Sequence, residues 1–177
     1  MSLNSDLLDF AVFTAIALLW AKWSKLDLGL RTPALRTAWP WILLFMAWIG
    51  AEWAISDFYP IDGDPGYVEQ MVQRSLPELL LSMVVLGPLG EELLFRGSLF
   101  SALLRRWGIW AAALVSGILW SVMHTEYEWW VVASFAASGV ILAIIRWKSG
   151  SLYPPLVLHA AANLLVVFYY HDLLPVA

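Results

Sequence analysis

The chain has 177 residues, of which 61% are hydrophobic and 14% are charged, whereas ordinary soluble domains carry about 25% charged residues. A soluble core of this size cannot bury so much apolar surface, and a disordered chain would need the opposite composition. There is no cysteine, which excludes disulfides and thiolate sites, and the net charge of −4 provides no electrostatic footprint for nucleic acid. The composition therefore predicts an all-α polytopic membrane helix bundle, whose length allows about six transmembrane helices.

Six apolar runs are long enough to cross a bilayer. They cover residues 7–21, 39–55, 76–104, 109–123, 129–145 and 153–170. The last run carries Pro154 and Pro155 in its first turn, where the missing N–H costs nothing. Residues 56–75 between the second and third runs are rich in Asp, Gly and Pro, and we expect a polar loop whose acidic part is a solvated linker rather than a cover for a site. No internal repeat is visible, so we expect a single integral-membrane domain over residues 1–177.

The distribution of charge predicts the orientation. Of the ten Lys and Arg residues, four lie between the first two runs, five lie from Arg96 to Lys148, and Arg74 alone lies on the other side. Most acidic residues lie opposite the basic segments. The positive-inside rule then places both termini outside the cytoplasm, and we expect a bacterial-type inner membrane. Asp6 and Asp9 precede the first run without a basic residue, which is unlike a cleavable signal peptide.

The third run contains the segment GPLGEELLFRG at residues 87–97. Ionisable side chains within a bilayer are costly and by default indicate a functional site. Glu92 and Arg96 are four residues apart and can pair on one helix face. Glu91 points about 100° away, lacks that partner and is a candidate general base. The alternative interpretation is that these three residues form the solvated end of a shorter helix.

Further polar residues lie in the fourth and sixth runs. His124 ends the fourth run, where an interfacial position is the alternative to a catalytic one. His159 and Asn163 are four residues apart on one helix face, and the alanines between them allow close helix packing. At about 1.5 Å of rise per residue, these groups and Glu91 can meet between the middle and the outer half of the membrane. Such a meeting requires the third helix to be long and tilted, over roughly residues 76–104.

A carboxylate, two histidines and an asparagine suit peptide hydrolysis or ion movement. In hydrolysis, Glu91 deprotonates a water that His124 helps to hold, while His159 and Asn163 donate hydrogen bonds to the oxyanion. A zinc site formed by Glu91, His124 and His159 is the alternative. The helical His-Glu-x-x-His signature is absent, and we favour a metal-free reaction without a cofactor.

Three segments together resemble the motifs of the CAAX-protease and bacteriocin-processing (CPBP, or Abi) family of intramembrane glutamic proteases. The segments are Glu-Glu-x-x-x-Arg at 91–96, an aromatic residue followed by x-x-x-His at 120–124, and His-x-x-x-Asn at 159–163. The resemblance covers residues 76–165, and Trp120 stands where the family usually has Phe. This family is related to the CAAX prenyl endopeptidase. The resemblance implies a membrane-anchored or membrane-adjacent protein, or a lipid-anchored peptide, as the substrate.

The resemblance also implies a role for each motif residue. Glu91 is the water-activating base, with His124 as its partner. His159 and Asn163 form the oxyanion site, while Glu92 and Arg96 form a structural ion pair. Two other functions remain compatible with these residues. One is a catalytically inactive scaffold of the same family, and the other is a proton-coupled transporter that uses Glu91 and the histidines as a relay.

Overall fold

The computed structural model describes residues 3–55 and 63–171. These residues are helical apart from short connections and one isolated bridge between Gly63 and Tyr127, so the all-α prediction is confirmed. Four helices are long and apolar enough to cross a membrane. They are α1 (Leu3–Ser24), α2 (Leu35–Ile55), α7 (Trp129–Ser149) and α8 (Tyr153–Tyr170), and they contain four of the six predicted spans.

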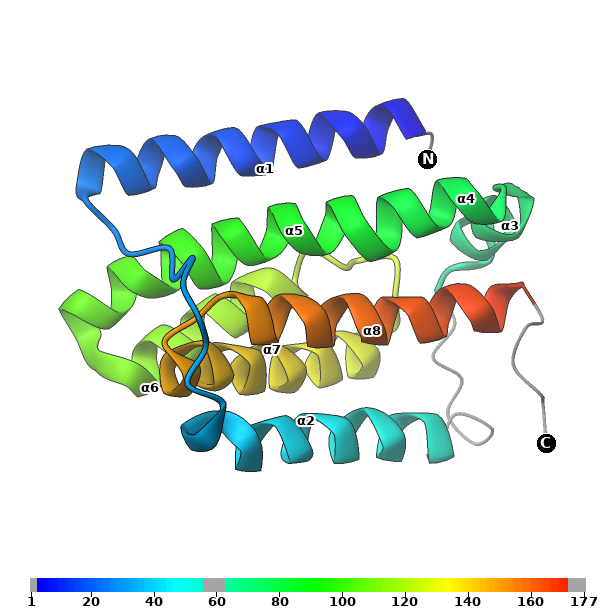
Figure 1. Cartoon of the computed structure of the whole chain (residues 1–177). Helices are drawn as coiled ribbons and strands as arrows, with labels where there is room; N and C mark the ends of the chain where they lie inside the picture. Colours follow the sequence, from blue (N-terminus) through cyan, green and yellow to red (C-terminus); the bar gives the residue numbers. More distant parts are fainter. Residues whose placement is uncertain (1–2, 56–62, 172–177) are drawn as a thin grey trace.

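The third and fourth predicted spans form one helical run that turns at Gly108 (Figure 1). This run consists of α4 (Leu76–Leu79), η1 (Leu80–Leu86), α5 (Gly87–Glu92), η2 (Leu93–Leu99) and α6 (Phe100–Ser121). The segments η1 and η2 are π-helical, with hydrogen bonds that skip one residue more than in an α-helix. Gly108 has a φ of +76°, which ends the first straight segment after residue 107. The long third helix is therefore present. The predicted meeting of its motif with the other two motifs requires this length.

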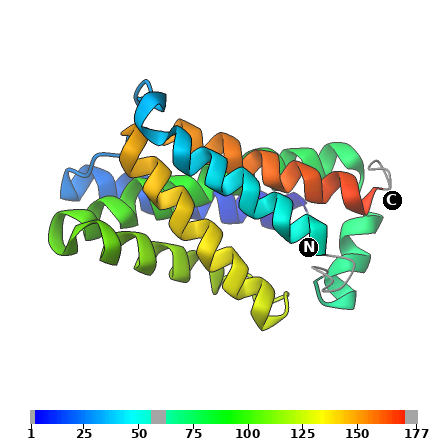
Figure 2. The same cartoon turned by 90° about the horizontal axis from the view of Figure 1, so that it is seen from below.

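The long helix of residues 76–107 lies between α1 and α8 (Figure 1). On the other side of the bundle, α7 packs against both α6 and α2. Figure 2 shows α2 and α7 diverging from the end where α2 begins and α7 ends. The backbones of α6 and α7 approach closely at two glycines, since a Cβ on Gly139 would lie 2.9 Å from the Cα of Gly117. Glycine pairs of this kind allow close helix packing inside membranes.

Large apolar side chains cover the outer surfaces of α1 and α2. Leu8 is 64% exposed, Trp39 is 56% exposed and Met46 is 58% exposed. A continuous apolar surface of this kind is rare on soluble monomers and fits contact with lipid. Moreover, α1 begins and α8 ends at the same end of the bundle, as an even number of spans requires (Figure 1).

The prediction of a polar loop over residues 56–75 is partly wrong, because residues 65–73 form α3 (Pro65–Gln73). The Asp64 side chain caps this helix by accepting the backbone N–H of Tyr67, and Pro65 occupies the first turn. Met71 is buried with Val167 of α8. A short amphipathic helix can thus pack its few apolar residues on the bundle despite its polar composition. The predicted linker residues 57 and 62 lie outside the described residues.

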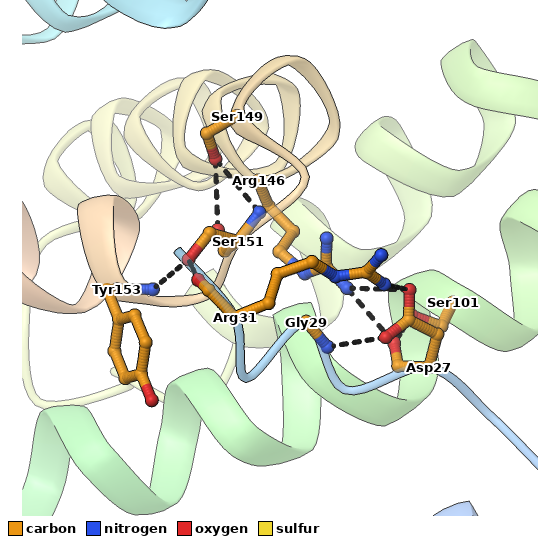
Figure 3. Close-up of polar contacts among 8 residues, drawn as sticks. All are labelled: Asp27, Gly29, Arg31, Ser101, Arg146, Ser149, Ser151 and Tyr153. Atoms are coloured by element: carbon orange, nitrogen blue, oxygen red, sulfur yellow. Dashed lines mark hydrogen bonds and ion pairs between the residues drawn. The ribbon is translucent and has the colours of Figure 1, made fainter. Parts of the chain in front are cut away.

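The connection between α1 and α2 lies at the end of the bundle opposite the termini (Figure 1) and is tied to α6, to α7 and to the connection between α7 and α8 (Figure 3). The Asp27 carbonyl accepts hydrogen bonds from Ser101 Oγ at 2.7 Å and from Arg146 Nη2 at 3.0 Å, and Ser151 Oγ donates to the Arg31 carbonyl at 2.6 Å. Gly29 has a φ of +72°, and a Cβ there would lie 2.3 Å from the Arg146 guanidinium. The loop therefore requires glycine at this position.

The Asp27 carboxylate belongs to the same set of contacts. It accepts the Gly29 N–H at 2.9 Å and pairs with Arg31. Partial burial raises the pKa of Asp27, but the two hydrogen bonds and the positive charges of Arg146 and Arg31 outweigh it and lower the pKa overall. Two of the arginines that predict the orientation thus also hold this loop.

The glycine contact between α6 and α7 leads to a stability prediction. We expect Gly139→Ala to destabilise the protein by about 1–3 kcal/mol, because the new methyl group overlaps backbone that cannot move independently. Gly50→Ala in α2 is the matched control, since a Cβ there meets nothing within 4 Å. Thermal unfolding in detergent micelles compares the two variants. Equal melting temperatures would contradict the close contact of the two helices.

Candidate active site

A cavity of about 540 Å³ lies between the helices, and we call it the central cavity. Its walls include residues of α1, α2, the long helix, α7 and α8. Four predicted site residues line it: Glu91, His124, His159 and Asn163. The structure therefore brings residues from three predicted spans to one cavity, although up to 72 positions separate them in the sequence.

Glu92 and Arg96 lie behind the cavity wall and are both 0% exposed. The Arg96 Nη1 donates to Glu92 Oε1 at 3.0 Å, and its Nη2 donates to the Gly139 carbonyl at 3.3 Å. The alternative interpretation, a solvated helix end, does not fit this burial. A charged pair inside an apolar bundle is stable only when each partner is neutralised and hydrogen-bonded.

Glu92 also contacts His159, which the sequence analysis does not predict. The Nδ1 of His159 lies 3.0 Å from Glu92 Oε1, and His159 is 4% exposed. Because an ionised carboxylate can only accept, this contact assigns a proton to Nδ1. The other ring nitrogen, Nε2, lies 3.9 Å from Glu91 Oε2. Glu92 is thus a partner of His159 as well as of Arg96.

Trp120 connects most of these groups. Its Nε1 donates to Glu91 Oε2, so Glu91 has a hydrogen-bond partner that the sequence analysis does not assign to it. The Arg96 guanidinium lies 4.6 Å from the centroid of the indole ring, as in a cation–π contact. The ring centroids of His124 and His159 lie 5.0 Å and 5.2 Å from that of Trp120. A Phe at this position would lack the N–H that reaches Glu91.

His124 lies just beyond the end of α6, which ends at Ser121. Its Nδ1 lies 3.2 Å from the Trp120 carbonyl, and its ring packs edge-on against Phe135 of α7. Trp120 therefore contacts both His124 and the carboxylate of Glu91. Both His124 and Glu91 face the central cavity.

Asn163 binds the long helix at a point where the backbone hydrogen bonding of that helix is interrupted. The Gly87 N–H donates to the Ser82 carbonyl, as in a π-helix. In the same register the Met83 carbonyl would accept from residue 88, which is proline and has no N–H. Asn163 Nδ2 donates to the Met83 carbonyl at 2.8 Å and fills this gap. The position of Asn163 thus depends on the proline in the motif segment.

The alternative zinc site is not assembled in the structure. Within residues 3–55 and 63–171, no three His, Asp or Glu side chains are arranged so that they could hold a metal ion. The set of Glu91, His124 and His159 is therefore not a ready-made ligand group. The metal-free reaction stays a prediction.

Two further polar features of the cavity wall are not predicted from the sequence. One is Glu52 on α2, an acidic residue inside an apolar run, to which the reasoning applied to Glu91 also applies. The other is Arg74, which is paired with Asp6 at 2.5 Å and is 8% exposed. Arg74 therefore neutralises a carboxylate inside the protein. This pair explains why Arg74 lies apart from the other basic residues.

Two tyrosines contact each other at the end of the cavity near α3. The hydroxyl groups of Tyr67 in α3 and of Tyr127 in the loop before α7 lie 3.4 Å apart. Burial raises the pKa of both phenols, so both remain neutral hydrogen-bonding groups. The contact joins α3 to the loop that carries His124.

The burial of Arg96 leads to a second prediction. We expect Arg96→Met to lower the free energy of unfolding by about 3–5 kcal/mol, because it leaves the Glu92 charge buried without a cation. Glu92→Gln added to this variant should restore part of the loss. Arg106→Met is the control, since Arg106 is exposed and should change stability by no more than about 0.5 kcal/mol. Unchanged unfolding of Arg96→Met in chemical denaturant would refute the buried pair.

Comparison with known proteins adds independent information about this site. The family model described as type II CAAX prenyl endopeptidase Rce1-like matches residues 73–165, just over half of the chain. No solved structure matches the chain.

Two curated proteins are similar to the chain. An Escherichia coli protein named "Uncharacterized 24.3 kDa protein" is 28% identical over 134 residues, which is 71% of this chain and 61% of that protein. A Bacillus subtilis (strain 168) protein named "Putative membrane peptidase YdiL" is 24% identical over 96 residues, 54% of this chain and 38% of that protein. The chain thus spans less than two thirds of the length of either relative. The matched region of the family model contains all three motifs of the cavity, and the chain belongs to the Rce1-like family of type II CAAX prenyl endopeptidases.

Proposed function

We propose that the protein is an intramembrane endopeptidase of the glutamic type, which hydrolyses a peptide bond of a membrane-anchored or membrane-adjacent protein. The observation that carries this proposal is the placement of the Glu91 carboxylate in a cavity between membrane-spanning helices, 3.9 Å from His159 Nε2. Membership of the Rce1-like family and the name of the B. subtilis relative support the same class of reaction.

In the proposed reaction, Glu91 takes a proton from a water molecule in the central cavity. The water oxygen attacks the carbonyl carbon of the scissile bond, and the carbonyl oxygen becomes an oxyanion. The carboxylic acid of Glu91 then gives its proton to the nitrogen of the leaving amine, and the carbon–nitrogen bond breaks. His124, at the cavity surface, helps to hold the water.

His159 and Asn163 stabilise the oxyanion by donating hydrogen bonds. The Nδ1 of His159 donates to Glu92, which lies 3.0 Å away. This contact orients the ring so that Nε2, 3.9 Å from Glu91 Oε2, is the nitrogen that meets the oxyanion. Asn163 is held by the Met83 carbonyl through one amide hydrogen and has a second hydrogen to offer.

Trp120 positions Glu91 in this scheme. The indole N–H binds Oε2 of the carboxylate, while the ring contacts both histidines. A general base must be held within hydrogen-bond reach of the proton that it removes. Trp120 therefore couples the position of the base to that of the oxyanion donors.

The catalytic assignment predicts the effect of two substitutions. We expect Glu91→Gln and His124→Ala each to lower the rate of peptide cleavage by about 100-fold or more, since general-base catalysis contributes factors of that size. The purified protein is incubated in liposomes with a peptide library, and the products are identified by mass spectrometry.

Glu69→Gln is the matched control for charge, because Glu69 lies on α3 outside the central cavity and is exposed. Full cleavage by both site variants, with unchanged thermal unfolding, would show that the assignment is wrong. Absence of cleavage by the wild type would instead favour the scaffold or the transporter.

A chelation experiment separates the two hydrolytic mechanisms. We expect a strong zinc chelator to leave the cleavage rate unchanged, because Glu91 activates water without a metal in the proposed reaction. The rate is measured before and after dialysis against the chelator, and again after zinc is added. Loss of activity that zinc restores would overturn the metal-free mechanism but not the assignment as a peptidase.

A further inference from the structure

Glu52 on α2 is an acidic residue in a membrane-spanning helix that the proposed reaction does not use. Its Oε1 accepts hydrogen bonds from Trp48 Nε1 at 3.1 Å and from Ser134 Oγ on α7. Both bonds that the described residues make with this carboxylate fall on Oε1, and Oε2 receives none of them. The carboxylate is thus held by two donors, while none of the described residues binds its second oxygen.

Glu52 lines the same central cavity as the proposed catalytic residues. Its donor Ser134 is followed in the chain by Phe135, whose ring centroid lies 5.3 Å from that of His124 and 6.1 Å from that of Trp120. One turn of α7 therefore contacts both Glu52 and the site. The carboxylate therefore belongs to the wall of the cavity that holds the proposed catalytic residues.

The described part of the chain offers Glu52 no cation. Arg74 is the only described Lys or Arg that lines the central cavity, and its guanidinium is paired with Asp6. A carboxylate in an apolar wall is stabilised by an opposite charge. For Glu52, a cationic ligand can supply that charge.

The shape of the wall specifies the kind of cation. Phe45, Trp48 and Ile49 also line the cavity, and their spacing from Glu52 places them on the same face of α2. The result is an apolar strip that ends in a carboxylate. The side chains of Lys and Arg have the matching form, with an apolar stem and a cationic head.

We propose that Glu52 forms a substrate-binding subsite that takes a Lys or Arg side chain of the peptide near the scissile bond. The subsite rests on the proposed function, since it gives that peptidase its preference among sequences. Trp48 and Ser134 orient the carboxylate, and the α2 face receives the stem of the side chain.

The test uses a peptide library made with a protease that cleaves after acidic residues, so that internal Lys and Arg are kept. We expect wild-type cleavage sites to carry Lys or Arg at one fixed distance from the scissile bond. Two reporter peptides, identical except for Lys or norleucine at that position, then give a ratio of kcat/KM values. Glu52→Gln keeps the acceptor oxygen for Trp48 and Ser134, and it should lower this ratio about tenfold or more.

Charge reversal provides the second variant. Glu52→Lys should shift the preference at the same position towards Asp and Glu, which a merely structural role would not produce. Glu69→Gln should leave the ratio at the wild-type value, and thermal unfolding shows which variants are folded.

The outcomes separate the two proposals. Cleavage by the wild type without a basic preference, or a Lys-to-norleucine ratio that Glu52→Gln does not change, would overturn the subsite and leave the peptidase intact. Absence of all cleavage by the wild type would overturn the proposed function and the subsite together.

Discussion

The buried pair of Glu92 and Arg96 is the interaction on which the site depends. Two charges without access to water must be neutralised by each other and by polar neighbours, or the bundle loses several kcal/mol. Arg96 therefore needs a carbonyl on another helix, and the glycines of α6 and α7 bring the Gly139 carbonyl within 3.3 Å. The same requirement places the Glu92 carboxylate against His159. The ion pair thereby joins the long helix to α7 and α8 through polar contacts.

The helix that carries these charges is irregular for a related reason. Two π-helical segments flank the short α5, and Pro88 removes a backbone donor between them. In a bilayer an unsatisfied carbonyl is costly, so a side chain from a neighbouring helix is required. Asn163 supplies it at the Met83 carbonyl. A local defect in one helix therefore determines where a proposed oxyanion donor of another helix lies.

Much of the fold could be predicted because a membrane helix is identified by the hydropathy and length of one continuous segment. The sixth predicted span and α8 share the same bounds, residues 153–170, since proline begins it and polar residues follow it. Glu92 and Arg96 were predictable as neighbours from the helical period alone. In contrast, α3 was not predicted, because a helix of nine residues with a polar composition resembles a turn-rich loop. The position of Glu52 inside an apolar run is visible in the sequence, but the partners of its carboxylate are not. The charge of Arg74 suggests a role in topology, whereas the structure pairs it with Asp6 inside the protein.

The amino-acid sequence by itself determined the membrane class, the helical composition and the three motifs, because hydropathy and helical spacing are properties of neighbouring residues. Only the tertiary structure decided that Glu92 holds His159, that Trp120 binds Glu91, and that Glu52 faces the same cavity. The two contacts join residues that lie 67 and 29 positions apart, and Glu52 lies 39 positions before Glu91. Hydropathy does not determine the rotation and tilt of the helices that bring these residues together. Packing at the glycines and the need to neutralise buried charge determine that rotation.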